Sequence, residues 1–136
     1  MEWMIMPLRR YADFNGRSRR MEYWMFTLGY ILLLLAIVML SFGIGGLFGD
    51  PTGELGAGIM VTLIGITVLG LFIPSLAVQV RRMHDQDKSG WFILLGFIPY
   101  IGGLIMLVFM CIEGTQGPNQ YGPDPKDPNW DADVFE

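Results

Sequence analysis

Charged residues are scarce in this 136-residue chain: Asp, Glu, Lys and Arg make up 16% of it, against about 25% in a typical soluble domain. Three windows, residues 23–49, 55–80 and 89–112, contain none of these four residue types. Hydrophobic residues make up 52%. This pattern excludes an ordinary soluble enzyme, a disordered chain and a nucleic-acid-binding protein, and it indicates a small integral membrane protein.

Reactive side chains are also few, because cysteine and histidine occur once each, as Cys111 and His84. A single cysteine excludes an internal disulfide, and the sequence has no HExxH motif, Cys pair or Ser-His-Asp arrangement. Residues 85–90 resemble the start of a calcium loop, but Gly96 stands where its bidentate Glu is required. We therefore predict no enzyme activity, no cofactor and no catalytic or metal-ligating residues.

Each charge-free window is long enough to cross a bilayer, since about 20 helical residues cover the hydrocarbon core of about 30 Å. We expect transmembrane helices at about 23–48, 57–80 and 90–112. Pro74 removes a backbone donor from the second helix, and the Ser75 hydroxyl is close enough to help satisfy the carbonyl that it frees.

The third window contains Pro99 followed by Gly102 and Gly103. We expect one spanning helix that is kinked at Pro99. The alternative is a re-entrant hairpin, which would return the C-terminus to the membrane side that the chain had left. The two topologies place the residues after 112 on opposite sides of the membrane.

Basic residues indicate the orientation, because Lys and Arg concentrate in cytoplasmic loops. Five precede the first window, none lies in the loop at 50–54, three lie in the loop at 81–88, and one follows the third window. This distribution predicts a multi-pass protein with a cytoplasmic N-terminus. Trp24 and Trp91 then both lie at the inner boundary, as interface anchors of an aromatic belt.

The two ends of the chain differ from its membrane body. Residues 7–14 are expected to form a short interfacial helix, with Pro7 at its first position and apolar residues at a spacing of three. Residues 126–136 are expected to form an acidic flexible tail, leaving residues 1–125 as a single membrane domain. The net charge of −4 belongs to residues 114–136, since the acids and bases of residues 1–113 balance.

The predicted topology gathers polar side chains at the cytoplasmic boundary, and three interpretations of this cluster stay open. The first is a salt-bridge network that locks the helices together, with Arg81–Asp85 and Glu22–Arg82 as pairs. The second is a site for anionic phospholipid headgroups. The third is a membrane-edge hydrolase that uses His84. The candidate residues are Arg17, Arg19, Arg20, Glu22, Arg81, Arg82, His84 and Asp85.

Three segments carry a resemblance to a known family. They read DFNGRSRRMEYW at 13–24, RRMHDQDKSGW at 81–91 with IPYIG at 98–102, and GTQGPNQYGPDP at 114–125. In this order and spacing they resemble the domain of unknown function 805 family, the YhaH/YhaI type of small bacterial inner-membrane protein. Phe92 and Gln120 depart from its usual residues. The resemblance implies an inner-membrane location and no assigned activity.

The sequence thus predicts an all-α polytopic membrane helix bundle with three transmembrane helices. We expect a structural or accessory module of the bacterial inner membrane, whose partners are the lipid bilayer and a second copy or another membrane protein. A transport role would require an oligomer, since three helices alone do not enclose a polar path. The predicted spans also contain no Asp, Glu, Lys, Arg or His, which counts against a transporter.

Overall fold

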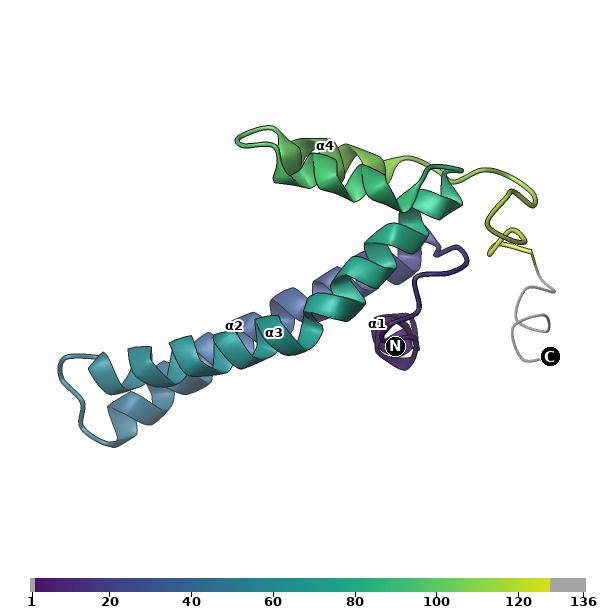
Figure 1. Ribbon diagram of the computed structural model, residues 1–136. Coiled ribbons are helices and arrows are strands. Elements are labelled where there is room, and N and C mark those ends of the chain that lie inside the picture. Colours follow the sequence, from purple (N-terminus) through teal and green to yellow (C-terminus); the bar gives the residue numbers. More distant parts are fainter. Residues whose placement is uncertain (1, 128–136) are drawn as a thin grey trace.

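The computed structural model describes residues 2–127, and helices dominate them (Figure 1). A lone bridge between Asn119 and Gly122 is the one β pairing in this range. The helical elements in chain order are α1 (Glu2–Arg9), α2 (Arg20–Leu47), α3 (Glu54–Asp85), the 3₁₀ helix η1 (Gly90–Phe97) and α4 (Gly102–Cys111).

Helices α2 and α3 form a long antiparallel hairpin (Figure 1). Their 28 and 32 residues correspond to about 42 and 48 Å at 1.5 Å per residue, which exceeds the hydrocarbon core of a bilayer. At the connecting loop the Asp50 carboxylate accepts backbone N–H bonds from Thr52, Gly53 and Leu55, which satisfies donors at the start of α3. The helices approach closely at Gly56, where a Cβ would lie 3.1 Å from the Ser41 carbonyl oxygen.

The apolar side chains of this hairpin are largely uncovered by the rest of the chain. Both helices are long and apolar enough to cross a membrane, and only 17% of the most apolar 18-residue stretch of α2 and 6% of that of α3 is buried. The core helix of a soluble protein would be mostly buried. The two helices correspond to the first two predicted spans, 23–48 and 57–80, with an added turn or so at most ends.

The carbonyl freed by Pro74 belongs to Gly70, four residues earlier in α3. The Tyr11 hydroxyl, which follows α1, donates a hydrogen bond of 2.5 Å to this oxygen. Ser75, the candidate predicted from the sequence, forms no such bond in the described structure. A residue 59 positions away therefore supplies the missing donor. It ties the segment between α1 and α2 (residues 10–19, which we call the N-terminal arm) to α3.

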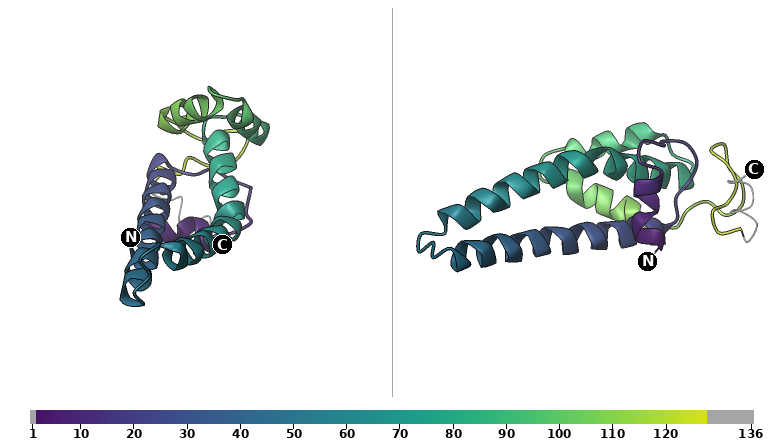
Figure 2. Two further views of the ribbon diagram at one scale, coloured as in Figure 1. Left: turned by 90° about the vertical axis from the view of Figure 1, so that its left-hand side faces the viewer. Right: turned by 90° about the horizontal axis from the view of Figure 1, so that it is seen from below.

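The third predicted span, 90–112, is not one helix, and this expectation is corrected. Its residues form η1 and α4, of 8 and 10 residues, which fold back on each other (Figures 1 and 2). The reversal occurs at Pro99 and at Tyr100, which adopts a left-handed φ of 69°. Neither helix has the length to cross a bilayer, since ten residues rise about 15 Å. The geometry is that of the alternative hairpin.

Small residues and aromatic rings hold this short hairpin closed. A Cβ at Gly102 would lie 2.5 Å from the Gly96 carbonyl oxygen, so only glycine allows this approach. The rings of Phe92 and Phe109 meet edge to face, with centroids 6.2 Å apart. Most of the outer surface stays exposed, including 77% of Trp91.

The N-terminal helix also departs from its predicted range of 7–14. Helix α1 begins at Glu2 and ends at Arg9, and it packs across α2 (Figure 2). After Arg9 the Asp13 N–H donates to the Arg10 carbonyl in a turn, and the Arg81 guanidinium donates to the carbonyl oxygens of Arg10 and Asp13. These carbonyls are thereby withdrawn from a continuing helix. Of the predicted acidic tail 126–136, residues 128–136 lie outside the described range.

Candidate functional site

Five charged side chains are buried together where α2 begins, α3 ends and the chain passes after α4. Each has a relative exposure of 4% or less. They come from two segments that are distant in sequence, 17–22 and 81–85, and the chain after α4 contributes backbone groups. We call them the arginine cluster: Arg17, Glu22, Arg81, Arg82 and Asp85.

Arg81 joins α3 to α2 and to the N-terminal arm. Its Nη2 lies 2.8 Å from the Glu22 carboxylate, and its Nε donates to the Ser18 hydroxyl at 2.9 Å. Its Nη1 donates to the Asp13 carbonyl at 2.8 Å. In addition, the Ser18 backbone N–H donates to the Arg81 carbonyl at 3.2 Å. A single guanidinium thus fixes the path of the arm before α2.

Asp85 is the shared acceptor of the other two arginines. Arg17 contacts one carboxylate oxygen at 2.9 Å, and Arg82 contacts the other oxygen. Gly114 lies against this carboxylate so closely that a Cβ would be 1.9 Å from Oδ2. The Thr115 N–H also donates to the Asp85 carbonyl at 2.7 Å, so the chain after α4 is part of the cluster.

Donors of the cluster and the neighbouring Gln86 also satisfy carbonyl groups at the C-termini of α3 and α4, which have no partners within their own helices. At the end of α3, Arg17 donates to the Asp85 carbonyl at 3.4 Å. Near the end of α4, Gln86 donates to the Phe109 carbonyl and Arg82 to the Ile112 carbonyl. Beyond it, Arg17 donates to the Gly117 carbonyl at 2.6 Å. The negative ends of the α3 and α4 dipoles therefore face guanidinium groups, which is the favourable arrangement.

Three guanidinium groups and two carboxylates leave this buried set with one excess positive charge. The backbone carbonyls around Arg17 and the C-terminal end of α3 offset that excess. Two buried polar atoms in the cluster, Glu22 Oε2 and Arg82 Nε, have no hydrogen-bond partner. Such a network orders the segments that it joins, and removing one member leaves an uncompensated buried charge.

His84 lies beside the cluster but takes no part in its ion pairs. Its Nδ1 is 3.1 Å from the Gly16 carbonyl oxygen, so this nitrogen carries the proton. Its ring stacks on Tyr121 with centroids 4.0 Å apart and an interplanar angle of 3°. Asn119 donates to the His84 carbonyl at 2.9 Å. Among residues 2–127, no three His, Cys, Asp or Glu side chains form a group that could hold a metal ion.

The remaining predicted basic residues lie at the rim. Arg20 pairs with Glu113 at 3.2 Å, and both side chains are roughly half exposed. Lys126 also bonds to Glu113, and this bond, followed by the charges of Lys126 and Arg20, lowers the pKa of the Glu113 carboxyl below its usual 4.5. Arg19 bonds to the Pro125 carbonyl, and its guanidinium carbon lies 5.3 Å from the Trp3 ring centroid.

The structure brings together all eight predicted cluster residues at one end of the molecule, but it pairs them differently. The predicted pairs Arg81–Asp85 and Glu22–Arg82 are wrong: Arg81 pairs with Glu22, and Arg82 pairs with Asp85. Positions three apart share a helix face as positions four apart do, so spacing alone leaves both partners of Asp85 open. The rotation of α3 against α2 selects between them.

Sequence reasoning missed several members of this end of the molecule. Ser18 and the carbonyls after α4 carry no charge, so no charge pattern reveals them. Gly114 and Tyr121 belong to the third segment that carries the family resemblance, and that segment was their only signal. The predicted anchors Trp24 and Trp91 both lie toward the cluster end of α2 and α3, and both are exposed.

Comparison with known proteins agrees with this architecture of apolar helices. The family model described as "Protein of unknown function (DUF805)" matches residues 11–123. Inner membrane protein YhaH of Escherichia coli (strain K12) is 46% identical over 93% of this chain and 98% of its own length. Inner membrane protein YhaI of the same strain is 43% identical over 93% and 97%, respectively. No solved structure matches.

The matched range begins at Tyr11, whose hydroxyl bonds to the Gly70 carbonyl that Pro74 leaves free. It ends after Gly122, beyond every backbone acceptor of Arg17. It therefore includes both long apolar helices, the short hairpin and the arginine cluster. The chain belongs to the DUF805 family, whose relatives here are inner membrane proteins of unknown function.

Proposed function

We propose that this protein is a non-catalytic structural module of the inner membrane. In this proposal α2 and α3 cross the bilayer, and η1–α4 is a re-entrant hairpin. The arginine cluster locks the hairpin, the segment before α2 and the segment after α4 together at the cytoplasmic boundary. The observation that carries the proposal is the burial of all five charged groups against partners within the chain.

Charge supports the orientation. With η1–α4 returning to its own side, every Lys and Arg precedes α2 or begins it, ends α3, or follows α3. The loop between Leu47 and Glu54 has none. Nine basic residues on one side and none on the other support a cytoplasmic location for both the N-terminus and the segment after α4.

The burial of the arginines argues against the two other interpretations of the cluster. Arg17, Arg81 and Arg82 are buried and bond to carboxylates and other acceptors of the chain, which argues against their guanidinium groups facing lipid phosphate. His84 contacts a carbonyl and an aromatic ring rather than a carboxylate or a nucleophile, which leaves a hydrolase without its base–orienter pair.

Reporter fusions test the topology. A reporter that is active only in the cytoplasm should work after residue 127 and at the N-terminus. A reporter that is active only in the periplasm should work when it is inserted at Pro51, between α2 and α3. Activity of the periplasmic reporter after residue 127 would show that the chain crosses a third time, and would overturn the re-entrant hairpin.

A matched pair of substitutions tests the structural role of the cluster. Asp85→Asn removes the carboxylate shared by two buried arginines and should lower the stability of the purified protein by about 3 kcal/mol. Arg20→Ala removes an exposed pair and should change stability by less than about 1 kcal/mol. Thermal unfolding in detergent measures both. Equal midpoints for Asp85→Asn and the parent would contradict a locking role.

A further inference from the structure

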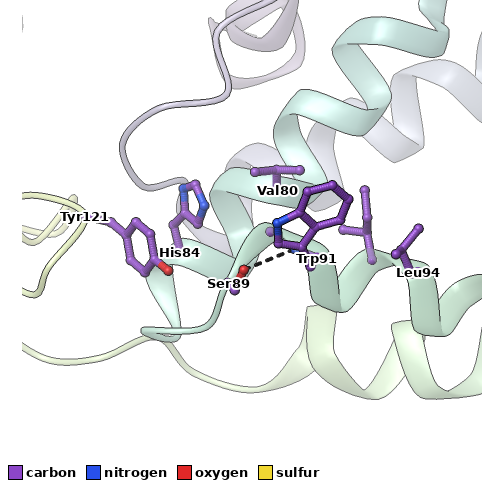
Figure 3. Close-up of a pocket in the computed structure, with 8 residues that line it drawn as sticks. Val80, His84, Ser89, Trp91, Leu94 and Tyr121 are labelled. Atoms are coloured by element: carbon purple, nitrogen blue, oxygen red, sulfur yellow. Dashed lines mark hydrogen bonds between the residues drawn. The ribbon is translucent and has the colours of Figure 1, made fainter.

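A cleft of about 370 Å³ opens beside His84, between the end of α3 and the start of η1 (Figure 3). Its walls are mostly apolar and include Val80, Ile93 and Leu94. Its polar groups are His84, Ser89, Tyr121 and the Trp91 indole. No charged residue lines it, in contrast to the adjacent arginine cluster.

His84 offers this cleft a hydrogen-bond acceptor. Because Nδ1 donates to the Gly16 carbonyl, the neutral ring carries its lone pair on Nε2. Stacking on Tyr121 fixes the ring plane. Gly90 keeps Nε2 uncovered, since a Cβ at that position would lie 3.5 Å from it. No residue of the described chain bonds to Nε2.

Trp91 offers a donor to the same space. Figure 3 shows its indole nitrogen on the edge of the ring that faces His84. Within residues 2–127 this N–H has no hydrogen-bond partner, and the side chain is 77% exposed. Ser89 caps η1 by accepting from the Trp91 backbone N–H, which holds the start of η1 in place.

We propose that this cleft binds an uncharged amphiphile through a hydroxyl group at its polar end. A hydroxyl can donate to His84 Nε2 and accept from the Trp91 indole at the same time. The apolar walls would take the first part of its hydrocarbon chain. A phosphate head is disfavoured because the cleft has no cation to pair with it, and the nearby Arg81 and Arg82 are committed within the cluster.

This inference needs the end of α3 to lie at a membrane boundary, but not a particular number of crossings. The probe is 1,2-dioleoylglycerol, added to the full-length protein in detergent and detected by native mass spectrometry. Two comparison lipids carry the same chains: the methyl ether of that hydroxyl, and dioleoylphosphatidylglycerol. We expect dioleoylglycerol to bind about tenfold more tightly than the methyl ether, which corresponds to one hydrogen bond.

Two variants and one control assign the binding to the cleft. His84→Phe keeps a ring against Tyr121 but removes Nε2 together with the Nδ1 bond to Gly16, and Trp91→Phe removes the indole donor together with part of the ring. Both should reduce dioleoylglycerol binding several-fold, whereas Trp24→Phe should leave it unchanged. If His84→Phe does not fold, Trp91→Phe and the methyl ether still decide the question.

Three results would overturn the proposal: equal binding of dioleoylglycerol and its methyl ether, binding that survives Trp91→Phe, or preferential binding of phosphatidylglycerol. The thermal midpoint of each variant is measured alongside. An unchanged midpoint with lost binding supports the cleft and is independent of the structural role of the arginine cluster.

Discussion

Two charge-free segments of similar length, residues 55–80 and 89–112, each contain one proline, yet they fold differently. Around Pro74 the helix α3 continues for 32 residues. Around Pro99 the chain reverses into two short helices. At Pro74 the Tyr11 hydroxyl satisfies the freed Gly70 carbonyl, and the helix passes through.

At Pro99 the corresponding carbonyl, that of Leu95, accepts instead from the Ile98 N–H at 3.2 Å, and a turn begins. The left-handed Tyr100 and the close contact of Gly102 then complete the reversal. The comparison shows that an apolar helix continues past a proline where a donor from another segment bonds to the freed carbonyl. Where a turn uses that carbonyl and nearby glycines allow close packing, the chain reverses.

Of the substitutions near the two prolines, Gly102→Ala is expected to lower the stability most. Its Cβ would meet the Gly96 carbonyl at 2.5 Å, so α4 must move away from η1, at a cost of about 1–3 kcal/mol. Thermal unfolding in detergent should therefore give a lower midpoint for Gly102→Ala than for the parent. Gly103→Ala is the matched control, since a Cβ there meets nothing within 4 Å. Equal midpoints for Gly102→Ala and Gly103→Ala would contradict the close contact of the hairpin.

A smaller effect is expected at the other proline. Tyr11→Phe removes the donor to the Gly70 carbonyl and should lower the stability by about 1 kcal/mol. Pro74→Ala restores a backbone N–H to α3, so in that background Tyr11→Phe should have almost no effect. Thermal unfolding of the four proteins of this cycle measures the coupling. The same loss in both backgrounds would show that Tyr11 acts through another contact.

The smallest effect is expected at the exit of the short hairpin, where Glu113 is exposed. Since its pKa lies below 4.5, its ionised form contributes stability above that pH, and the contribution is lost as the pH falls through the lowered pKa. A carboxyl titration by NMR should show an apparent pKa below 4.5 that rises in Lys126→Ala. A pKa at or above 4.5 in the parent would contradict the Lys126 contact.

The sequence was sufficient to predict α2 and α3, because a stretch of about 20 or more apolar residues without charge is typical of a membrane-spanning helix. It also located the polar end of the molecule, since Arg17, Glu22, Arg81 and Asp85 flank the apolar segments. Both the kinked helix and the hairpin were compatible with Pro99, and the structure has two short helices that form a hairpin there. The approach of Gly102 to Gly96 decides between them, and it is a tertiary contact.

The site was less predictable than the fold. Ion pairing depends on how α3 is rotated against α2, so the partners of Arg81 and Arg82 were exchanged. The role of Tyr11 was hidden because its partner is a backbone carbonyl 59 residues away. Uncharged acceptors such as the Gly117 carbonyl give no signal in a charge pattern, although they accept hydrogen bonds from Arg17.

The hydrogen bond between Arg17 and the Gly117 carbonyl joins positions 100 residues apart, and this separation has a consequence for biosynthesis. Chains are made from the N-terminus, so Arg17 leaves the ribosome long before its acceptors at 115 and 117. The two long helices can therefore be in place while Arg17 still lacks those carbonyls. The bonds that join the two ends of this network therefore form last, after the chain has been made through Gly117.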